Sequence, residues 1–211
     1  MIDPRSIDLA DLLVTWYGAP SRDERPLPAS CDWLPEPLKK WHTFAARWDV
    51  QLTSTTVMIS PEKVHVADDG MATFMVDATG DWRWCVDPAE PDLVFDAERY
   101  EPWERSSETL SELLVHNTVR EVVYGARAGK RAVAASDEVL SEVLATMDEI
   151  SFGPWRWPVP GFRTFMGSMT IAEAIETSAS SGWDVDVVAP TLERLSHLDR
   201  LPGVHWRTRG Q

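Results

Sequence analysis

The side chains best suited to metal binding or nucleophilic chemistry in this chain are its histidines and cysteines. They are His42, His65, His116, His197 and His205, together with Cys31 and Cys85. The histidines lie far apart, and none has a second ligand at the spacing typical of a zinc site. Two cysteines are too few for a disulfide framework. We therefore predict free thiols, no bound metal and no cofactor.

Motifs for a phosphate-binding loop or a serine nucleophile are also absent. No glycine-rich loop leads to Lys followed by Ser or Thr, and no Gly-x-Ser-x-Gly sequence occurs. Cys31 or Cys85 with a distant histidine could form a nucleophile and a base, but the alternating pattern around Cys85 favours a packing role. We predict no catalytic residue. An enzyme acting on a cationic or neutral small molecule is the less favoured alternative. It stays open because two of the carboxylates could form an acid-base pair.

Carboxylates are concentrated in one segment of the chain. The 211 residues include 34 Asp and Glu against 20 Lys and Arg, a formal net charge of −14. Residues 68–104 contain eleven of the carboxylates and three tryptophans, with only Arg83 and Arg99 in opposition, so the local balance is −9. Such a field attracts cationic partners and repels phosphate backbones and anionic membranes. We predict no direct binding to nucleic acid or to a membrane.

An aromatic side chain ringed by carboxylates is the composition of a protein-recognition surface. The residues predicted to contact a basic partner are Asp68, Asp69, Asp81, Trp82, Asp87, Glu90 and Asp92. Four of these aspartates, at 68, 69, 81 and 87, occupy predicted turns, where a short carboxylate commonly accepts backbone N–H groups. A solvated acidic face that only aids solubility is therefore the alternative.

Hydrophobic periodicity predicts the elements that position these residues. Spacings of three and four residues indicate helices over 7–16, 37–48, 110–123, 139–150 and 191–198. Their predicted N-caps include Ser6, Ser107 or Thr109, and Ser136. Alternation indicates strands over 56–59, 63–66, 72–76, 82–86, 93–95, 162–169, 183–188 and 204–207. Residues 125–130 fit a loop, and residues 170–177 fit either a helix or a strand.

Together these elements predict an α+β fold, with a mostly antiparallel sheet of about six strands flanked by helices. The length fits one domain or two small ones, and we predict a single domain over residues 1–211. The first residues lack a basic region followed by an apolar stretch, and no run of 18 apolar residues occurs. We therefore predict a cytoplasmic protein.

Several short motifs follow one another in a recognisable order. They are Leu34-Pro35 before Leu38 and Trp41, Val57 to Pro61, Phe74-x-x-Asp77, Gly80-x-Trp82-x-Trp84, Asp92-Leu-Val94, Trp103, and Leu110-Ser-Glu-Leu-Leu114. This order resembles the SUKH superfamily. The resemblance covers roughly residues 32–124 and implies a more divergent C-terminal part, 125–211. Many relatives carry Glu-Asn-Gln or a similar sequence where this chain has Asp77-Ala78-Thr79.

The SUKH superfamily includes fungal cell-wall-assembly regulators and many bacterial immunity proteins, which bind the polymorphic toxin of their own cell. The resemblance implies an α+β domain that neutralises a cognate basic toxin, such as a nuclease, without chemistry of its own. Carboxylates held in order could occupy a basic cleft and accelerate association. A regulatory or scaffold module that binds other proteins, as the fungal relatives suggest, is the alternative.

Overall fold

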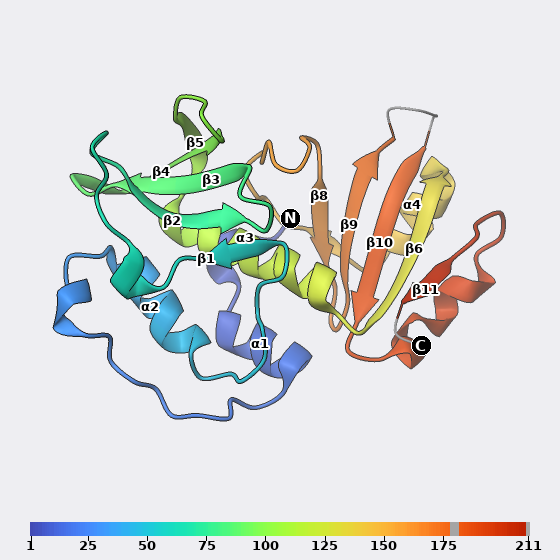
Figure 1. Ribbon diagram of the computed structural model, residues 1–211. Helices are drawn as coiled ribbons and strands as arrows, with labels where there is room; N and C mark the ends of the chain where they lie inside the picture. The colour runs from blue at the N-terminus through green and yellow to red at the C-terminus, as the bar shows by residue number, and fades with distance from the viewer. Residues whose placement is uncertain (178–181, 210–211) are drawn as a thin grey trace. The chain divides into compact units, whose positions relative to one another are not determined.

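The computed structural model describes residues 1–177 and 182–209 (Figure 1). It confirms the α+β class and contains two antiparallel sheets, one of five strands and one of six. The contacts divide the chain into two compact units. Residues 17–124 form the meander unit, and residues 1–16 with 125–211 form the six-stranded unit. Among the described helices, none has the length and apolar character needed to cross a bilayer.

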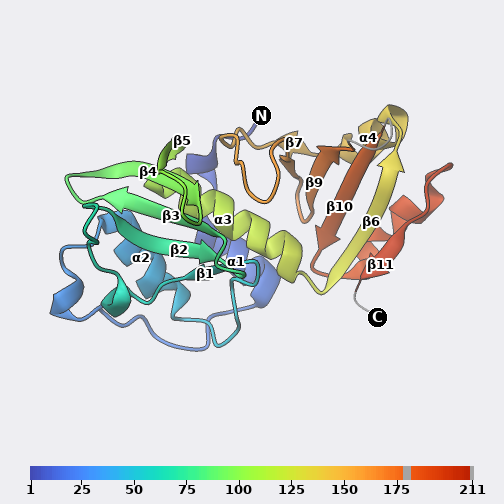
Figure 2. The same ribbon diagram turned by 45° about the horizontal axis from the view of Figure 1, so that its top comes forward.

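The meander unit contains a sheet whose strands are neighbours both in sequence and in space. The strands are β1 (Thr56–Met58), β2 (Ala72–Asp77), β3 (Trp82–Asp87), β4 (Glu90–Glu98) and β5 (Glu104–Thr109). The helices are α2 (Glu36–Ala45) and α3 (Leu110–Gly125), with short 3-10 helices η2 (Ala29–Cys31) and η3 (Pro61–Lys63). Figures 1 and 2 both show α3 lying along this sheet.

Strand register defines two faces of the meander sheet. Trp84 pairs with Met75 and Asp96, and Val86 pairs with Val94, so these residues share an inner face. Thr56 lies on the same face, and its Oγ1 is 3.2 Å from Asn117 Oδ1 of α3. The opposite, outer face includes Val57, Val76, Arg83, Phe95 and Arg105. Val57 is 49% exposed, so this outer face meets solvent at its β1 edge.

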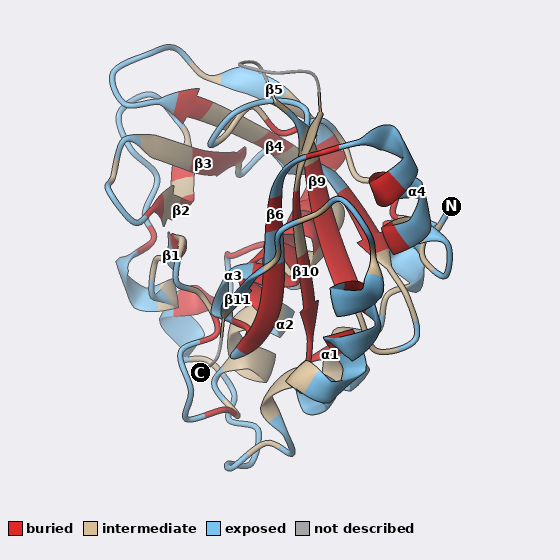
Figure 3. Cartoon of the chain, turned by 90° about the vertical axis from the view of Figure 1, so that its right-hand side faces the viewer, coloured by how far each residue is buried: buried red, intermediate tan, exposed pale blue. Residues whose placement is uncertain are grey.

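The six-stranded unit has the strand order β11-β6-β10-β9-β8-β7. These strands are β6 (Ala128–Ala135), β7 (Asp148–Glu149), β8 (Arg163–Met166), β9 (Ile171–Glu176), β10 (Trp183–Ala189) and β11 (Arg207–Arg209). Its helices are η1 (Pro4–Ser6), α1 (Leu9–Tyr17, all but its last residue), α4 (Asp137–Leu144) and η4 (Leu192–Arg200). The core forms where α4 and η4 pack on the sheet, and β6, β9 and β10 are largely buried (Figure 3).

Two of the predicted helix caps are confirmed by the side-chain contacts. Glu112 N–H donates to Thr109 Oγ1, and Glu112 Oε2 accepts from Thr109 N at 2.9 Å, which is a capping box at the start of α3. Ser136 accepts from Val139 N at the start of α4. Ser6 does not cap α1, because Asp8 Oδ1 accepts the N–H groups of Ala10 and Asp11 instead.

One predicted strand is absent, and some strands form where none was predicted, for identifiable reasons. Residues 63–66 form no strand, because Pro61 begins a 3-10 turn and only Val66 forms a bridge, with Ala72. Residues 125–130 were predicted as a loop, yet β6 begins at Ala128 and lies between β10 and β11. Strand β5 was not predicted because its sequence, Glu-Arg-Ser-Ser-Glu-Thr, lacks apolar alternation. Of the two alternatives for residues 170–177, the strand is observed as β9.

Candidate protein interface

The seven predicted contact residues lie at three places on the meander unit. Asp68 and Asp69 lie in the turn that precedes β2, and Asp81 and Trp82 lie at the start of β3. Asp87, Glu90 and Asp92 flank the turn that joins β3 to β4. Because β3 separates Asp81 from Asp87 by six residues, these two lie about 20 Å apart along the strand. The meander therefore gathers the residues on one sheet but does not place them in one compact patch.

Six of the seven predicted contact residues are carboxylates, and none of the six has a salt-bridge partner among the described residues. No described Lys or Arg forms an ion pair with Asp68, Asp69, Asp81, Asp87, Glu90 or Asp92. The ion pairs that the structure does show lie elsewhere, as between Arg163 and Glu149. Carboxylates without an internal cation stay available to a cation from another protein.

The aspartates at turns also have the backbone roles that their positions predict. Asp69 Oδ1 accepts Met71 N–H at 3.0 Å, and Asp87 Oδ1 accepts Ala89 N–H at 2.8 Å. Asp81 Oδ2 accepts the Thr79 hydroxyl at 2.9 Å. The second carboxylate oxygen of each residue, Asp81 Oδ1 and Asp87 Oδ2, accepts no hydrogen bond from a described residue. The turn role and a contact with a partner are therefore compatible at these two positions.

Trp82 lies on the inner face, where its strand neighbour Trp84 is buried. It pairs with Glu98 of β4 and is partly buried, whereas Trp84 is only 1% exposed. The tryptophan on the outer side is Trp103, whose Nε1 donates to Asp69 Oδ2 at 2.9 Å. The Arg83 guanidinium carbon lies 4.0 Å from the centroid of its ring, a cation–π contact.

This arrangement fixes the ionisation of Asp69 and shields a cysteine. The hydrogen bond from Trp103, together with that from Met71, holds the pKa of Asp69 below its usual range, so Asp69 is charged at neutral pH. Cys85 is 0% exposed, and burial raises the pKa of its thiol. Cys31 is also buried, and both are free thiols, as predicted. A buried thiol with a raised pKa is a poor nucleophile.

Sequence reasoning missed the most exposed aromatic side chain of the meander. Tyr100 is 85% exposed and has a φ of 74°, a backbone conformation that is strained for a bulky residue. Its turn is held by three hydrogen bonds: Arg99 N to Asp81 O, Glu101 N to Glu98 O, and Arg83 Nη2 to Glu101 O, at 2.6 to 3.0 Å. An aromatic residue between charged ones in Glu98-Arg99-Tyr100-Glu101 was the available sequence signal.

Three exposed carboxylates surround the Tyr100 turn. Asp81, Glu98 and Glu101 lie in or beside it, and none of them forms an ion pair with another described residue. Arg99 is the one cation in this turn, and its guanidinium carbon lies 5.0 Å from the Tyr100 ring centroid. We call Asp81, Glu98, Tyr100 and Glu101 the Tyr100 rim. It is an exposed aromatic group with carboxylates, on a turn held by backbone hydrogen bonds.

A buried carboxylate on α3 forms the densest polar cluster of the meander unit. Glu121 is 1% exposed and accepts hydrogen bonds from the N–H and hydroxyl groups of Ser54, Thr55 and Thr56. The bonds from Thr55 and Thr56 measure 2.7 to 3.1 Å. Burial and the nearby Glu121 raise the pKa of Tyr17 to about 12. This cluster ties the start of β1 to α3 and has a structural role.

The meander unit also contains a histidine and a carboxylate within hydrogen-bond reach, a pair of the kind that acid-base catalysis uses. His116 Nδ1 and Glu108 Oε1 lie 2.9 Å apart. Burial lowers the pKa of His116 more than Glu108 raises it, so the neutral ring donates its Nδ1–H to the carboxylate. Both residues are only 5% exposed, so the pair offers little surface to a substrate. The pair links β5 to α3.

Neither a metal site nor a similar known protein points to a function. Within residues 1–177 and 182–209, no three His, Cys, Asp or Glu side chains are grouped so that they could hold a metal ion. Comparison with protein-family models, curated proteins and solved structures found no match. The SUKH resemblance therefore stays a prediction based on motif order.

Proposed function

We propose that this protein binds a basic protein partner through the Tyr100 rim and acts by occupying the partner's cationic surface. The observation that supports this most is the strained, exposed Tyr100, held among carboxylates that form no ion pair within the described chain. Strained residues persist where the surrounding structure holds them, and they concentrate at functional sites. Tyrosine is also enriched among the residues that dominate binding energy in interfaces.

The hydrogen bonds of the Tyr100 turn favour tight binding, because they order the turn before the partner arrives. An ordered loop loses less conformational entropy on association. Each exposed carboxylate contributes little by itself and gains strength only when it is desolvated against a cation. The rim carboxylates would therefore form ion pairs around the tyrosine. Asp87, Glu90 and Asp92, about 20 Å away along β3, would act mainly by accelerating encounter.

In this proposal the partner is a cognate toxin with a basic cleft, and the protein is an immunity protein. The Arg and Lys side chains of a phosphate-binding cleft also bind carboxylates. The order of motifs that resembles the SUKH superfamily supports the same class, and binding alone would neutralise the toxin. A regulatory module would instead bind several cellular proteins with moderate affinity and would give no protection against a toxin.

The Tyr100→Asn variant tests both the strain and the binding role of the rim. We expect the free energy of unfolding to rise by roughly 0.5 to 1 kcal/mol, because Asn tolerates positive φ better than a bulky residue does. The partner is first sought by co-purification with the product of any toxin-like gene adjacent to the gene of this protein. We expect the affinity for that partner to fall by about 30-fold, the effect of losing a dominant aromatic contact. Chemical denaturation and titration calorimetry measure the two quantities.

A matched control is Trp33→Asn, which removes another exposed aromatic side chain of the meander unit, 42% exposed. This variant should bind the partner as the wild type does. If Tyr100→Asn binds equally well, the rim is not the interface. If the wild type neither binds nor neutralises the neighbouring gene product, the immunity function is wrong.

A further inference from the structure

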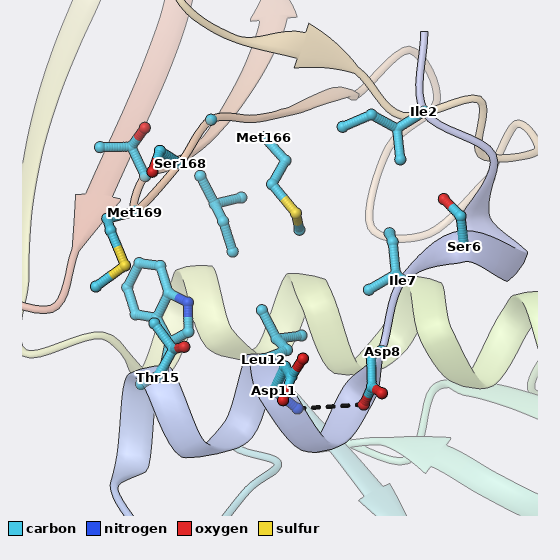
Figure 4. Close-up of a pocket in the computed structure, with 14 residues that line it drawn as sticks. Ile2, Ser6, Ile7, Asp8, Asp11, Leu12, Thr15, Met166, Ser168 and Met169 are labelled. Carbon is cyan, nitrogen blue, oxygen red and sulfur yellow. Dashed lines mark hydrogen bonds between the residues drawn. The ribbon is translucent and has the colours of Figure 1, made fainter.

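A cavity of about 340 Å³ lies within the six-stranded unit, between α1 and the turn that joins β8 to β9 (Figure 4). Its walls are mostly apolar. Ile7, Leu12 and Trp16 come from the N-terminal segment, and Met166, Met169 and Ile171 come from β8, β9 and their turn. The volume is at the lower end of the range for small-molecule sites.

The charged side chains that line this cavity are both acidic. Asp8 caps α1 through Oδ1, which accepts the N–H groups of Ala10 and Asp11 at 2.7 and 3.2 Å. Figure 4 shows the bond from Asp11. Asp11 is exposed, and its carboxylate has no hydrogen bond or ion pair with any described residue. The first turn of a helix stabilises a negative charge at this position. The Asp11 carboxylate thus lies beside an apolar cavity, and no cation of the described residues is paired with it.

Neutral polar groups and a tightly packed turn complete the walls. The Trp16 indole N–H and the hydroxyls of Thr15 and Ser168 have no hydrogen-bond partner in the part of the chain that the structure describes. The turn itself is closely packed, because a Cβ at Gly167 would lie 2.8 Å from Thr170 Oγ1 and 3.1 Å from the Thr146 carbonyl oxygen. The part of the cavity wall that this turn forms is therefore held in place by close packing.

We propose that this cavity binds a small amphipathic amine, a protonated amino group on an apolar or aromatic body. Packing at the density of a protein interior limits the ligand to on the order of a dozen non-hydrogen atoms. The ammonium pairs with Asp11, while the apolar body packs between the Trp16 ring and the two methionines, whose sulfur atoms make favourable contacts with aromatic rings. This site is independent of the Tyr100 rim.

Proton–nitrogen NMR of the full chain, with phenethylamine as the probe, tests the proposal. The Trp16 indole N–H is the reporter, and its resonance is assigned with the Trp16→Phe variant. We expect a saturable shift with a Kd of about 1 mM or below, the affinity reached by a good small ligand of this size. Phenethyl alcohol, which has the same shape without the charge, should bind about 10-fold more weakly, and phenylacetate should not bind.

Two variants locate the site and its charge. Asp11→Asn should weaken phenethylamine binding about 10-fold, whereas the control Glu138→Gln, at an exposed carboxylate in the first turn of α4, should not change it. Thr15→Phe fills the cavity from an exposed position and should abolish binding. The proposal is overturned by any of three results: no saturable shift up to about 10 mM probe, equal affinity for the amine and the alcohol, or unchanged binding by Thr15→Phe.

Discussion

Replacing Glu121 with Gln is expected to lower the free energy of unfolding by about 3 kcal/mol or more. In the native protein the carboxylate accepts bonds from six donors on Ser54, Thr55 and Thr56, in a site that is 1% exposed. An amide offers one oxygen and turns an N–H₂ group towards donors. Several buried donors would lose their acceptor, at about 1 to 3 kcal/mol each. Urea denaturation at neutral pH measures the difference.

The control for this substitution is Glu98→Gln, which changes an exposed carboxylate of the same unit. Its stability should lie within about 0.5 kcal/mol of the wild type, as is usual for surface changes. Equal stabilities of the two variants would show that Glu121 does not tie residues 54–56 to α3.

Acidification from pH 7.5 to 5 is expected to lower the stability by about 2 kcal/mol through His42 alone. Burial lowers the pKa of His42 to about 4, against a smaller opposing effect of Glu62. The unfolded chain takes up a proton below its ordinary pKa of about 6.5, but the folded protein does not until about pH 4. The stabilisation present above pH 6.5 is therefore lost progressively as the pH falls from about 6.5 towards about 4. Urea denaturation at both pH values gives the change.

The His42→Phe variant isolates this contribution. It keeps an aromatic ring beside Trp41, whose ring centroid lies 5.2 Å from that of His42, but it cannot titrate. The variant should lose about 2 kcal/mol less than the wild type over the same pH interval. The His65→Gln control, at an exposed histidine, should keep the full pH dependence. The same pH dependence in His42→Phe and the wild type would contradict the role of His42.

Local signals in the sequence predicted the elements whose stability is mainly local. Thr109 and Ser136 cap α3 and α4 through bonds to residues three positions later, and such bonds can be read from spacing. Strand β6 could not be predicted in this way. Its Lys130 is 4% exposed in side chain and pairs with Asp199 of η4, so this part of the strand depends on a residue distant in sequence.

The candidate interface was predictable in its charge but not in its geometry. Turn chemistry placed the aspartates correctly at bends, and composition showed the excess of carboxylates. The separation of Asp81 from Asp87 depends on the length of β3. The conformation of the Tyr100 turn depends on the Asp81 carbonyl, which accepts Arg99 N–H, and on Arg83, which donates to the Glu101 carbonyl. Glu121 has no sequence signal, because a helical Glu is usually on the surface.

The affinity of the neighbouring toxin-like gene product for two triple variants tests the Tyr100 rim most directly. The rim variant combines Asp81→Asn, Glu98→Gln and Glu101→Gln, and the hairpin variant combines Asp87→Asn, Glu90→Gln and Asp92→Asn, so both lose the same charge. At roughly 50 mM and 200 mM salt, we expect the rim variant to bind about 30-fold more weakly than wild type, with a shallower salt dependence. The hairpin variant should stay within about threefold of wild type. Equal losses in the two variants, or no loss in either, would contradict binding through the rim.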